Sequence, residues 1–274
     1  MTTLEELGLL KMDFLGLRTL TVIQDTIDLV KQNQGIDVKF DEKMNDPKVY
    51  KLWQNGESVG IFQFESQGMT NFMKELKPDC LEDIIAGVSL YRPGPMDQIP
   101  RYIANKKDPE HAVYTHPALK PILEVTYGCM VYQEQVMQIV RDLAGYSLGR
   151  ADLVRRAMGK KKLDVMAKER EIFIHGQTDE NGNIVVPGCI RNGIDEQSAN
   201  KIFDEMAEFA KYAFNKSHAA AYAVVSYRTA YLKAYYPTEF MAAMLNSFLG
   251  NLDKVPGYIE ECKRLSIQIL KPDI

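Results

Sequence analysis

Helix-start and helix-stop residues recur along this chain at the ends of runs whose apolar residues repeat every three or four positions. One run, DPKVYKLWQNG, carries the full set of signals. Asp46 can cap the first turn, Pro47 suits the first helical position, and Gly56 stands just past the expected end. These signals predict a helix between Asp46 and Gly56.

The same signals predict helices over most of the chain. Apolar residues between positions 17 and 30 share one helical face, and Ser66 is the expected cap of a later helix. Asp79 and Glu82 stand at the spacing of a capping box. Further helices are predicted at residues 133–145, 150–158, 163–176, 195–214, 217–236 and 238–250.

Strand candidates are few and short. They lie at residues 9–15, 125–132, 184–186 and 267–270, and the third falls in a segment expected to form a small hairpin or a polar loop. No internal repeat and no low-complexity linker divides the sequence. The predicted fold class is mainly α, an irregular multi-helix domain with a few short strands.

Composition narrows the class of protein. The 274 residues are 46% hydrophobic and 26% charged, which is typical of a soluble globular protein. No apolar run is long enough to span a membrane and the N-terminus lacks the order of a signal peptide, so we expect a cytoplasmic protein with no membrane partner. The four cysteines stand far apart, which predicts buried reduced thiols and neither a zinc site nor a disulfide framework.

The densest positive charge lies in RADLVRRAMGKKK, residues 150–162. Six cations face Asp152 alone, which leaves a local charge of +5 (six minus one) in a chain whose net charge is −4. Adjacent arginines such as Arg155 and Arg156 can fork onto the oxygens of a triphosphate. The apolar residues of the segment would give it a face to dock by: Leu153, Val154, Ala157 and Met158. A solvated basic helix face is an equal alternative from the residues alone.

A second constellation occupies FNKSHAAAYAVVSYRTAYLKAYY, residues 214–236. Ser217 is the expected cap of a helix whose first turn would attract anions, with Lys216 and His218 beside it. Rings and cations then interleave along the helix, a mixture suited to stacking and phosphate contact: Tyr222, Tyr227, Arg228, Tyr231 and Lys233. The alternative is that most of these tyrosines pack in the core and that the histidine is structural.

Two isolated residues complete the candidates. Arg92 stands in LYRPGPMDQIP, where three prolines and a glycine would hold it on a stiff turn. Asp13 stands between Met12 and Phe14, close to the change from strand-like alternation to helical periodicity. From these residues alone, Asp13 reads more simply as an exposed strand aspartate near a turn.

Five long motifs occur in a fixed order: LLKMDFLGLRTL, YRPGPM, VYQEQVMQI, RRAMGKKK, and FNKSHAAAYA followed by LKAYYPTEFMAA. Together they resemble the catalytic α subunits of bacterial DNA polymerase III, the C-family polymerases, and the first motif is closer to the DnaE type than to the PolC type. The resemblance implies that residues 1–18 are the C-terminal tail of the palm and residues 19–250 the fingers domain. Residues 251–274 would end the fingers and lead into a helix-hairpin-helix region.

The resemblance also implies a role for Asp13. In the family, the matching aspartate is one of three palm carboxylates that hold two Mg²⁺ ions for nucleotidyl transfer to a primer 3′-hydroxyl, with pyrophosphate leaving. The other two come from an upstream D-x-D motif, and this sequence contains no D-x-D. The chain is therefore expected to be a fragment that is inactive alone.

Site residues follow from the same resemblance. The incoming deoxynucleoside triphosphate (dNTP) would be bound by Arg155, Arg156, Lys160, Lys216, Ser217 and His218, and DNA by Lys161, Lys162 and Arg92. Gln133 and Glu134 would shape the pocket. The implied partners are primer–template DNA, dNTP and, through regions outside this chain, other subunits of the polymerase III holoenzyme. The competing hypothesis is a non-catalytic helical module that binds nucleic acid or a partner through its basic helix.

Overall fold

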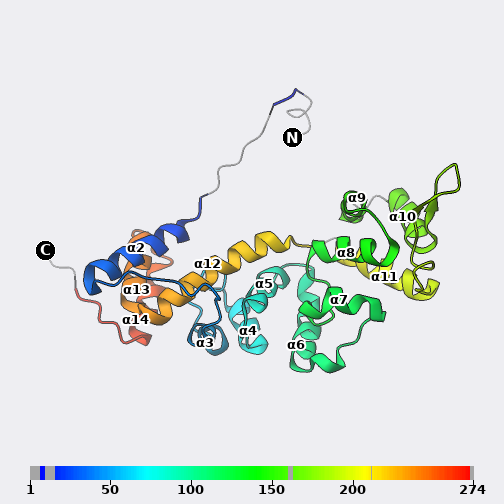
Figure 1. The fold of residues 1–274 in the computed structure, drawn as a ribbon. Helices are drawn as coiled ribbons and strands as arrows, with labels where there is room; N and C mark the ends of the chain where they lie inside the picture. The colour runs from blue at the N-terminus through cyan, green and yellow to red at the C-terminus, as the bar shows by residue number, and fades with distance from the viewer. Residues whose placement is uncertain (1–6, 10–15, 160–162, 211, 272–274) are drawn as a thin grey trace.

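A computed structural model of the chain describes residues 7–9, 16–159, 163–210 and 212–271 (Figure 1). Within these ranges the chain forms 13 α-helices, four short 3₁₀ helices and one two-stranded hairpin. The prediction of a mainly α fold is confirmed. The candidate strand at residues 9–15 lies almost entirely outside the described residues.

The helices follow one another along the chain, and the hairpin lies between α10 and α11. The first six are α2 (Arg18–Gln34), α3 (Pro47–Asn55), α4 (Gln67–Leu76), α5 (Leu81–Leu90), α6 (Ile99–Lys107) and α7 (Lys120–Leu123). Then come α8 (Gln133–Ala144), α9 (Leu148–Gly159), α10 (Leu163–His175), α11 (Glu196–Ala210), α12 (Lys216–Tyr235), α13 (Pro237–Ser247) and α14 (Val255–Arg264). The predicted hairpin is confirmed, with β1 (Gln177–Thr178) antiparallel to β2 (Ile184–Val186).

Helix α12 runs along the middle of an elongated molecule and organises its packing (Figure 1). Its C-terminal half packs with α2 and α13, and its middle packs with α3 and α5. Ala219, Ala223 and Ala230 face the second of these groups, where small side chains let the helices approach closely. A separate hydrophobic core is shared by the five helices from α7 through α11. It lies beyond the N-terminal end of α12.

Local capping signals are mostly confirmed. The Asp46 carboxylate accepts the N–H of Lys48 at 2.8 Å, and Ser66 Oγ accepts the N–H of Met69 at 3.3 Å. The capping box of Asp79 and Glu82 is wrong. Because α5 begins at Leu81, its third residue is Asp83, and Asp83 Oδ2 accepts the N–H of Asp79 at 3.1 Å.

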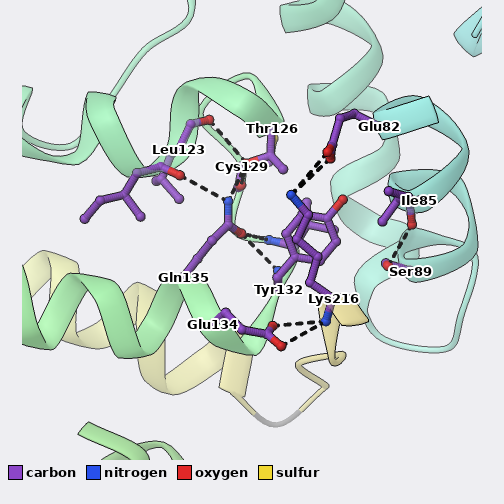
Figure 2. Close-up of polar contacts among 12 residues, drawn as sticks. Glu82, Ile85, Ser89, Leu123, Thr126, Cys129, Tyr132, Glu134, Gln135 and Lys216 are labelled. Carbon is purple, nitrogen blue, oxygen red and sulfur yellow. Dashed lines mark hydrogen bonds and ion pairs between the residues drawn. The ribbon is translucent and has the colours of Figure 1, made fainter. Parts of the chain in front are cut away.

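The predicted strand at residues 125–132 is wrong. A 3₁₀ turn opens the segment, and Tyr127 has a left-handed φ of 51°. The Gln135 side chain accepts the N–H groups of Val131 (2.8 Å) and Tyr132 (3.0 Å), as Figure 2 shows. A side chain therefore satisfies backbone groups that a strand would pair with a neighbour.

The predicted strand at residues 267–270 is also wrong. These residues follow α14 as irregular chain and pair with no strand in the part of the chain that the structure describes. Helix α14 itself was not predicted. It buries Tyr258 and Cys262 against α13, so tertiary packing stabilises a helix of only ten residues.

A buried ion pair fastens α14 to α12. Lys233 Nζ lies 2.6 Å from Glu261 Oε1 and donates to the carbonyl oxygens of Glu57 and Val59, each at 2.7 Å. All three protons of the ammonium group thus have an acceptor. Lys233 and Tyr227 are both fully buried, so neither can contact a ligand, and the alternative that the tyrosines of this helix pack in the core is confirmed for Tyr227.

The prediction that the cysteines are buried reduced thiols is confirmed for three of the four. Cys129, Cys189 and Cys262 are buried free thiols, and Cys80 is half-buried and free. No helix in the described ranges is long and apolar enough to cross a lipid bilayer.

Candidate functional site

Helix α9 buries one face in the core and carries the paired arginines beside it, with Arg155 half-buried and Arg156 exposed. Ala151, Val154, Ala157 and Met158 are buried, as an amphipathic helix requires. Leu153 is 66% exposed, so its assignment to the docking face is wrong. The helix ends at Gly159, and Lys160, Lys161 and Lys162 lie outside the described residues.

One carboxylate holds both arginines. Asp152 Oδ1 accepts hydrogen bonds from Arg155 Nε (3.1 Å) and Nη2 (2.7 Å), and Asp152 Oδ2 lies 2.7 Å from Arg156 Nε. The hydrogen bond from Arg155 holds the pKa of the Asp152 carboxyl below its usual value. Asp152 is therefore ionised at neutral pH and offsets part of the charge of the two guanidinium groups.

Arg155 has a second anchor on a different helix. Its Nη1 donates to Gln133 Oε1 at 3.0 Å, and Gln133 is the first residue of α8. The backbone N–H of Gln133 donates in turn to the carbonyl oxygen of Phe214 at 2.9 Å, just ahead of α12. Arg155 is thus tied through Gln133 to the start of α12.

Glu134, the next residue of α8, occupies the N-terminus of α12 (Figure 2). Its carboxylate accepts the N–H of Lys216 (3.0 and 3.1 Å) and the side-chain amide of Asn215 (2.7 Å). Asn215 is the N-cap, with Oδ1 accepting the N–H of His218 at 2.9 Å, so the prediction that Ser217 caps the helix is wrong. The cap falls two residues earlier because the chain turns at Asn215 in an extended conformation.

The Lys216 side chain points back toward α5. Its Nζ lies 3.1 Å from Glu82 Oε2 and 5.1 Å from the centre of the Tyr132 ring (Figure 2). The Lys216 side chain keeps 34% of its surface exposed and Glu82 keeps 44%. An ion pair this accessible is weak, so Lys216 can exchange Glu82 for another anion.

A row of aromatic rings lies along the first turns of α12 and the segment just before it. We call this region, residues 214–222 with the neighbouring Arg92, the corner. The Arg92 guanidinium lies 4.2 Å from the centre of the Phe214 ring, and Phe214 packs edge-on against His218 at 5.3 Å. The centres of the His218 and Tyr222 rings lie 4.2 Å apart, and the centres of the Tyr222 and Phe62 rings lie 5.2 Å apart. His218 is exposed and Tyr222 is half-buried, so part of this row faces solvent.

The loop that carries Arg92 also packs closely against the segment before α12. Gly94 has a φ of 104°, and a Cβ atom built there would lie 2.4 Å from the Tyr212 ring. Only glycine tolerates this conformation and this close contact. The loop therefore supports the segment before α12 at two points, through Tyr212 and through Phe214.

Two of the predicted groups converge on the start of α8. Gln133 binds the Arg155 guanidinium, and the adjacent Glu134 binds the backbone N–H of Lys216, whose ammonium group points toward Glu82. Ser217 and His218 follow Lys216 in the exposed first turn of α12, and Arg92 reaches the same corner through Phe214. The predicted metal ligand, Asp13, lies outside the described residues.

Among the described residues, the cluster with the spacing of a metal site is Asp79, Cys80 and Asp83, whose ligand atoms lie within 4.8 Å of one another. The Lys106 ammonium group contacts both carboxylates, at 3.1 Å from Asp79 and more closely from Asp83. A cation thus already neutralises this cluster. It does not fit a magnesium site, which needs carboxylate oxygens free of an ammonium group.

The sequence of the chain matches the family model for the finger domain of the bacterial DNA polymerase III alpha subunit over residues 19–181. This is more than half of the chain, so the chain belongs to that family, and the resemblance drawn from its motifs is confirmed.

Relatives in three bacteria agree. The chain is 50% identical to DNA polymerase III subunit alpha of Thermus aquaticus over all of its length, and 52% identical to that of Rickettsia felis over 97% of it. It is 48% identical to the Borreliella burgdorferi subunit, again over all of its length. The chain spans 21% to 23% of the length of these three relatives.

The sequence did not indicate that two carboxylates contact the cations of the candidate site. Asp152 was counted only as an opposing charge, and Glu82 only as part of a capping box. Both contact cations of the predicted site. The spacing of Asp152 from Arg155 and Arg156, three and four residues on one helix, is a local signal that identifies its pairs. No local signal connects Glu82 to Lys216, because the two stand 134 residues apart.

Proposed function

We propose that the protein to which this chain belongs is a DNA-directed DNA polymerase, and that the chain contributes the fingers that bind the incoming dNTP. The observation that carries the proposal is the junction at the start of α8, where Gln133 accepts a hydrogen bond from the Arg155 guanidinium and the adjacent Glu134 accepts one from the backbone N–H of Lys216. The junction anchors two helices that each carry a cation, and several cations suit a ligand with several phosphate groups.

In this proposal different residues bind different parts of the dNTP and the DNA. Arg155 and Arg156, with Lys160, bind the phosphates, and Lys216 binds a phosphate after exchanging Glu82 for it. Ser217 and His218 stand in the exposed first turn of α12, where a hydroxyl and a ring can contact the sugar. Lys161, Lys162 and Arg92 contact the DNA backbone, which any base sequence presents.

Asp13 holds magnesium in this proposal. A carboxylate is the ligand type that Mg²⁺ prefers, and the remaining carboxylates come from palm residues outside this chain. The bound ions would activate the primer 3′-hydroxyl and neutralise the leaving pyrophosphate. The residues of this chain orient the triphosphate for that transfer.

The proposal extends to the setting of the whole protein. Residues 1–18 belong to the palm, residues 19–250 to the fingers, and residues 251–274 lead toward a helix-hairpin-helix region. The partners are primer–template DNA, dNTP and other subunits of the polymerase III holoenzyme. A bacterial enzyme that copies chromosomal DNA works in the cytoplasm.

Primer extension by the whole α subunit tests the proposal. Asp13→Ala should abolish nucleotide incorporation, whereas Asp25→Ala, an aspartate on α2, should leave it near the wild-type rate. The pair Arg155→Ala and Arg156→Ala should lower kcat/KM for dNTP by about 10-fold or more, since each hydrogen bond to a charged group contributes about 1.5–3 kcal/mol. Full activity of Asp13→Ala would exclude the metal role, and an unchanged kcat/KM would remove the arginines from the site.

A further inference from the structure

The two adjacent arginines of α9 are not equivalent. Arg155 is 22% exposed and has two partners, Asp152 and Gln133. Arg156 is 63% exposed and is held by Asp152 Oδ2 at 2.7 Å, and no other polar partner of Arg156 lies among the described residues. Removing Asp152 would leave Arg155 anchored to α8 and would leave Arg156 without an anchor.

Asp152 cannot be explained by the stability of α9 alone. Ion pairs at three and four residues on a helix face contribute little to the stability of the helix. The core face of α9 already packs through Ala151, Val154 and Met158. The carboxylate instead places a negative charge between two cations that are proposed to receive a triphosphate.

A carboxylate in this position opposes phosphate binding in two ways. A phosphate oxygen that approaches Arg156 through Nε has to replace Asp152 Oδ2, so breaking that ion pair offsets part of the binding free energy. The charge of Asp152 also stays within a few ångströms of the bound phosphates and repels them. Both effects apply to the incoming dNTP and to the pyrophosphate that is left after the transfer.

From this geometry we propose that Asp152 is a positioning residue that holds Arg156 in place until a phosphate replaces it, and that limits how tightly the site retains pyrophosphate. This inference rests on the proposed function, because it requires that Arg156 binds phosphate. Arg155, fixed by Gln133, stays in place throughout, and Arg156 is the arginine that changes partner.

The test uses the whole α subunit in primer extension. Asp152→Asn keeps the size of the side chain and removes its charge. It should lower both the KM for dNTP and the inhibition constant of pyrophosphate by about two- to five-fold, which is the range that an exposed ion pair of 0.4–1 kcal/mol sets. A residue that only supported the helix would give the opposite sign, a higher KM for dNTP together with a lower melting temperature.

Three further variants isolate the effect. Asp142→Asn removes the same charge from α8, where Asp142 pairs with Arg141, and should leave both constants unchanged. Asp152→Glu restores the charge and should return both constants toward wild type. Arg156→Ala should raise the KM for dNTP and the inhibition constant of pyrophosphate.

The outcomes separate the inference from the proposed function. If Arg156→Ala weakens dNTP binding while Asp152→Asn leaves both constants unchanged or raises them, the role of Asp152 is overturned and the site stands. If Arg156→Ala changes neither constant, both the site and the role of Asp152 are overturned. A fall in both constants for Asp152→Asn, absent in Asp142→Asn, supports the inference.

Discussion

The two ends of α12 hold the same chemical pair in opposite environments. Lys216, in the first turn, pairs with Glu82 at 3.1 Å, and 34% of the lysine side chain and 44% of the glutamate side chain are exposed. Lys233, near the last turn, pairs with Glu261 at 2.6 Å, and the exposed fractions are 0% and 4%. The first pair faces solvent beside the proposed nucleotide site, and the second is sealed between α12 and α14.

The difference lies in what each lysine can still bind. Lys233 donates to Glu261 and to two backbone carbonyls, so its ammonium group is saturated and unavailable to a ligand. Lys216 has one exposed carboxylate partner and a ring, which a phosphate can replace at little cost. One helix therefore fastens the scaffold at its C-terminal end and carries the proposed ligand-binding cation at its N-terminal end.

The largest expected effect is on stability at the buried end. Lys233→Met leaves Glu261 buried without its closest cation and leaves two carbonyl oxygens without a donor. The free energy of unfolding should fall by about 3–5 kcal/mol, measured by urea denaturation. Lys216→Met, the matched change at the exposed end, should lower it by less than about 1 kcal/mol.

A double variant sharpens this comparison. Replacing both Lys233 and Glu261 by Met removes the buried carboxylate that Lys233→Met leaves with Arg264 as its cation, so the double variant should be more stable than Lys233→Met alone. If the two lysine variants lost equal stability, burial would not be the property that distinguishes the two ends.

The next largest effect concerns the buried polar support beneath the exposed site. Gln135 accepts the N–H groups of Val131 and Tyr132 and donates to Thr126 Oγ1 at 2.8 Å (Figure 2). Gln135→Leu should lower the free energy of unfolding by about 2–4 kcal/mol, since each buried group left unsatisfied costs about 1–3 kcal/mol. Gln138→Leu, on the exposed face of α8, is the control and should change it by less than about 0.5 kcal/mol.

A smaller effect follows from pH. Burial raises the pKa of the Glu261 carboxyl, but the hydrogen bonds from Arg264 and Lys233 outweigh burial and hold the pKa below the usual 4.5. A lowered carboxyl pKa gives stability that is complete above 4.5 and is lost as the pH falls through the folded-state value. Urea denaturation between about pH 6 and pH 3.5 should therefore show a steeper loss in the wild type than in Glu261→Gln. Parallel curves would contradict this role for Glu261.

Local signals in the sequence predicted the parts of the fold that local contacts determine. Asp46 and Ser66 cap the first turns of their helices and Gly56 follows the last residue of one, as predicted. A cap can be predicted because it needs only the residues of one turn. Residues 125–132 have the composition of a strand, but Gln135 accepts the N–H groups of Val131 and Tyr132, which a strand would pair with a neighbour. The hydrogen bonds of a side chain four residues away were not visible in the periodicity.

The candidate site was predictable in part for the same reason. The motifs identified Arg155, Arg156 and Lys216 as cations of interest, yet the anchoring of Arg155 by Gln133 and of the Lys216 backbone by Glu134 depends on contacts between distant segments. Lys233 carried the same expectation as Lys216, and only the position of α14 distinguishes the two lysines. Burial decides the role of a charged residue, and burial is a property of the whole fold.

The measurement that tests the account most directly is the Kd of dNTP for the complex of the whole α subunit with primer–template DNA, from single-turnover incorporation rates. Lys216→Met should raise this Kd about 10-fold, as expected for the loss of one charge-assisted hydrogen bond. Arg228→Met, at an exposed cation in the second half of α12, should change it by less than about two-fold. Equal Kd values for the two variants would contradict the claim that the first turn of α12 binds the nucleotide.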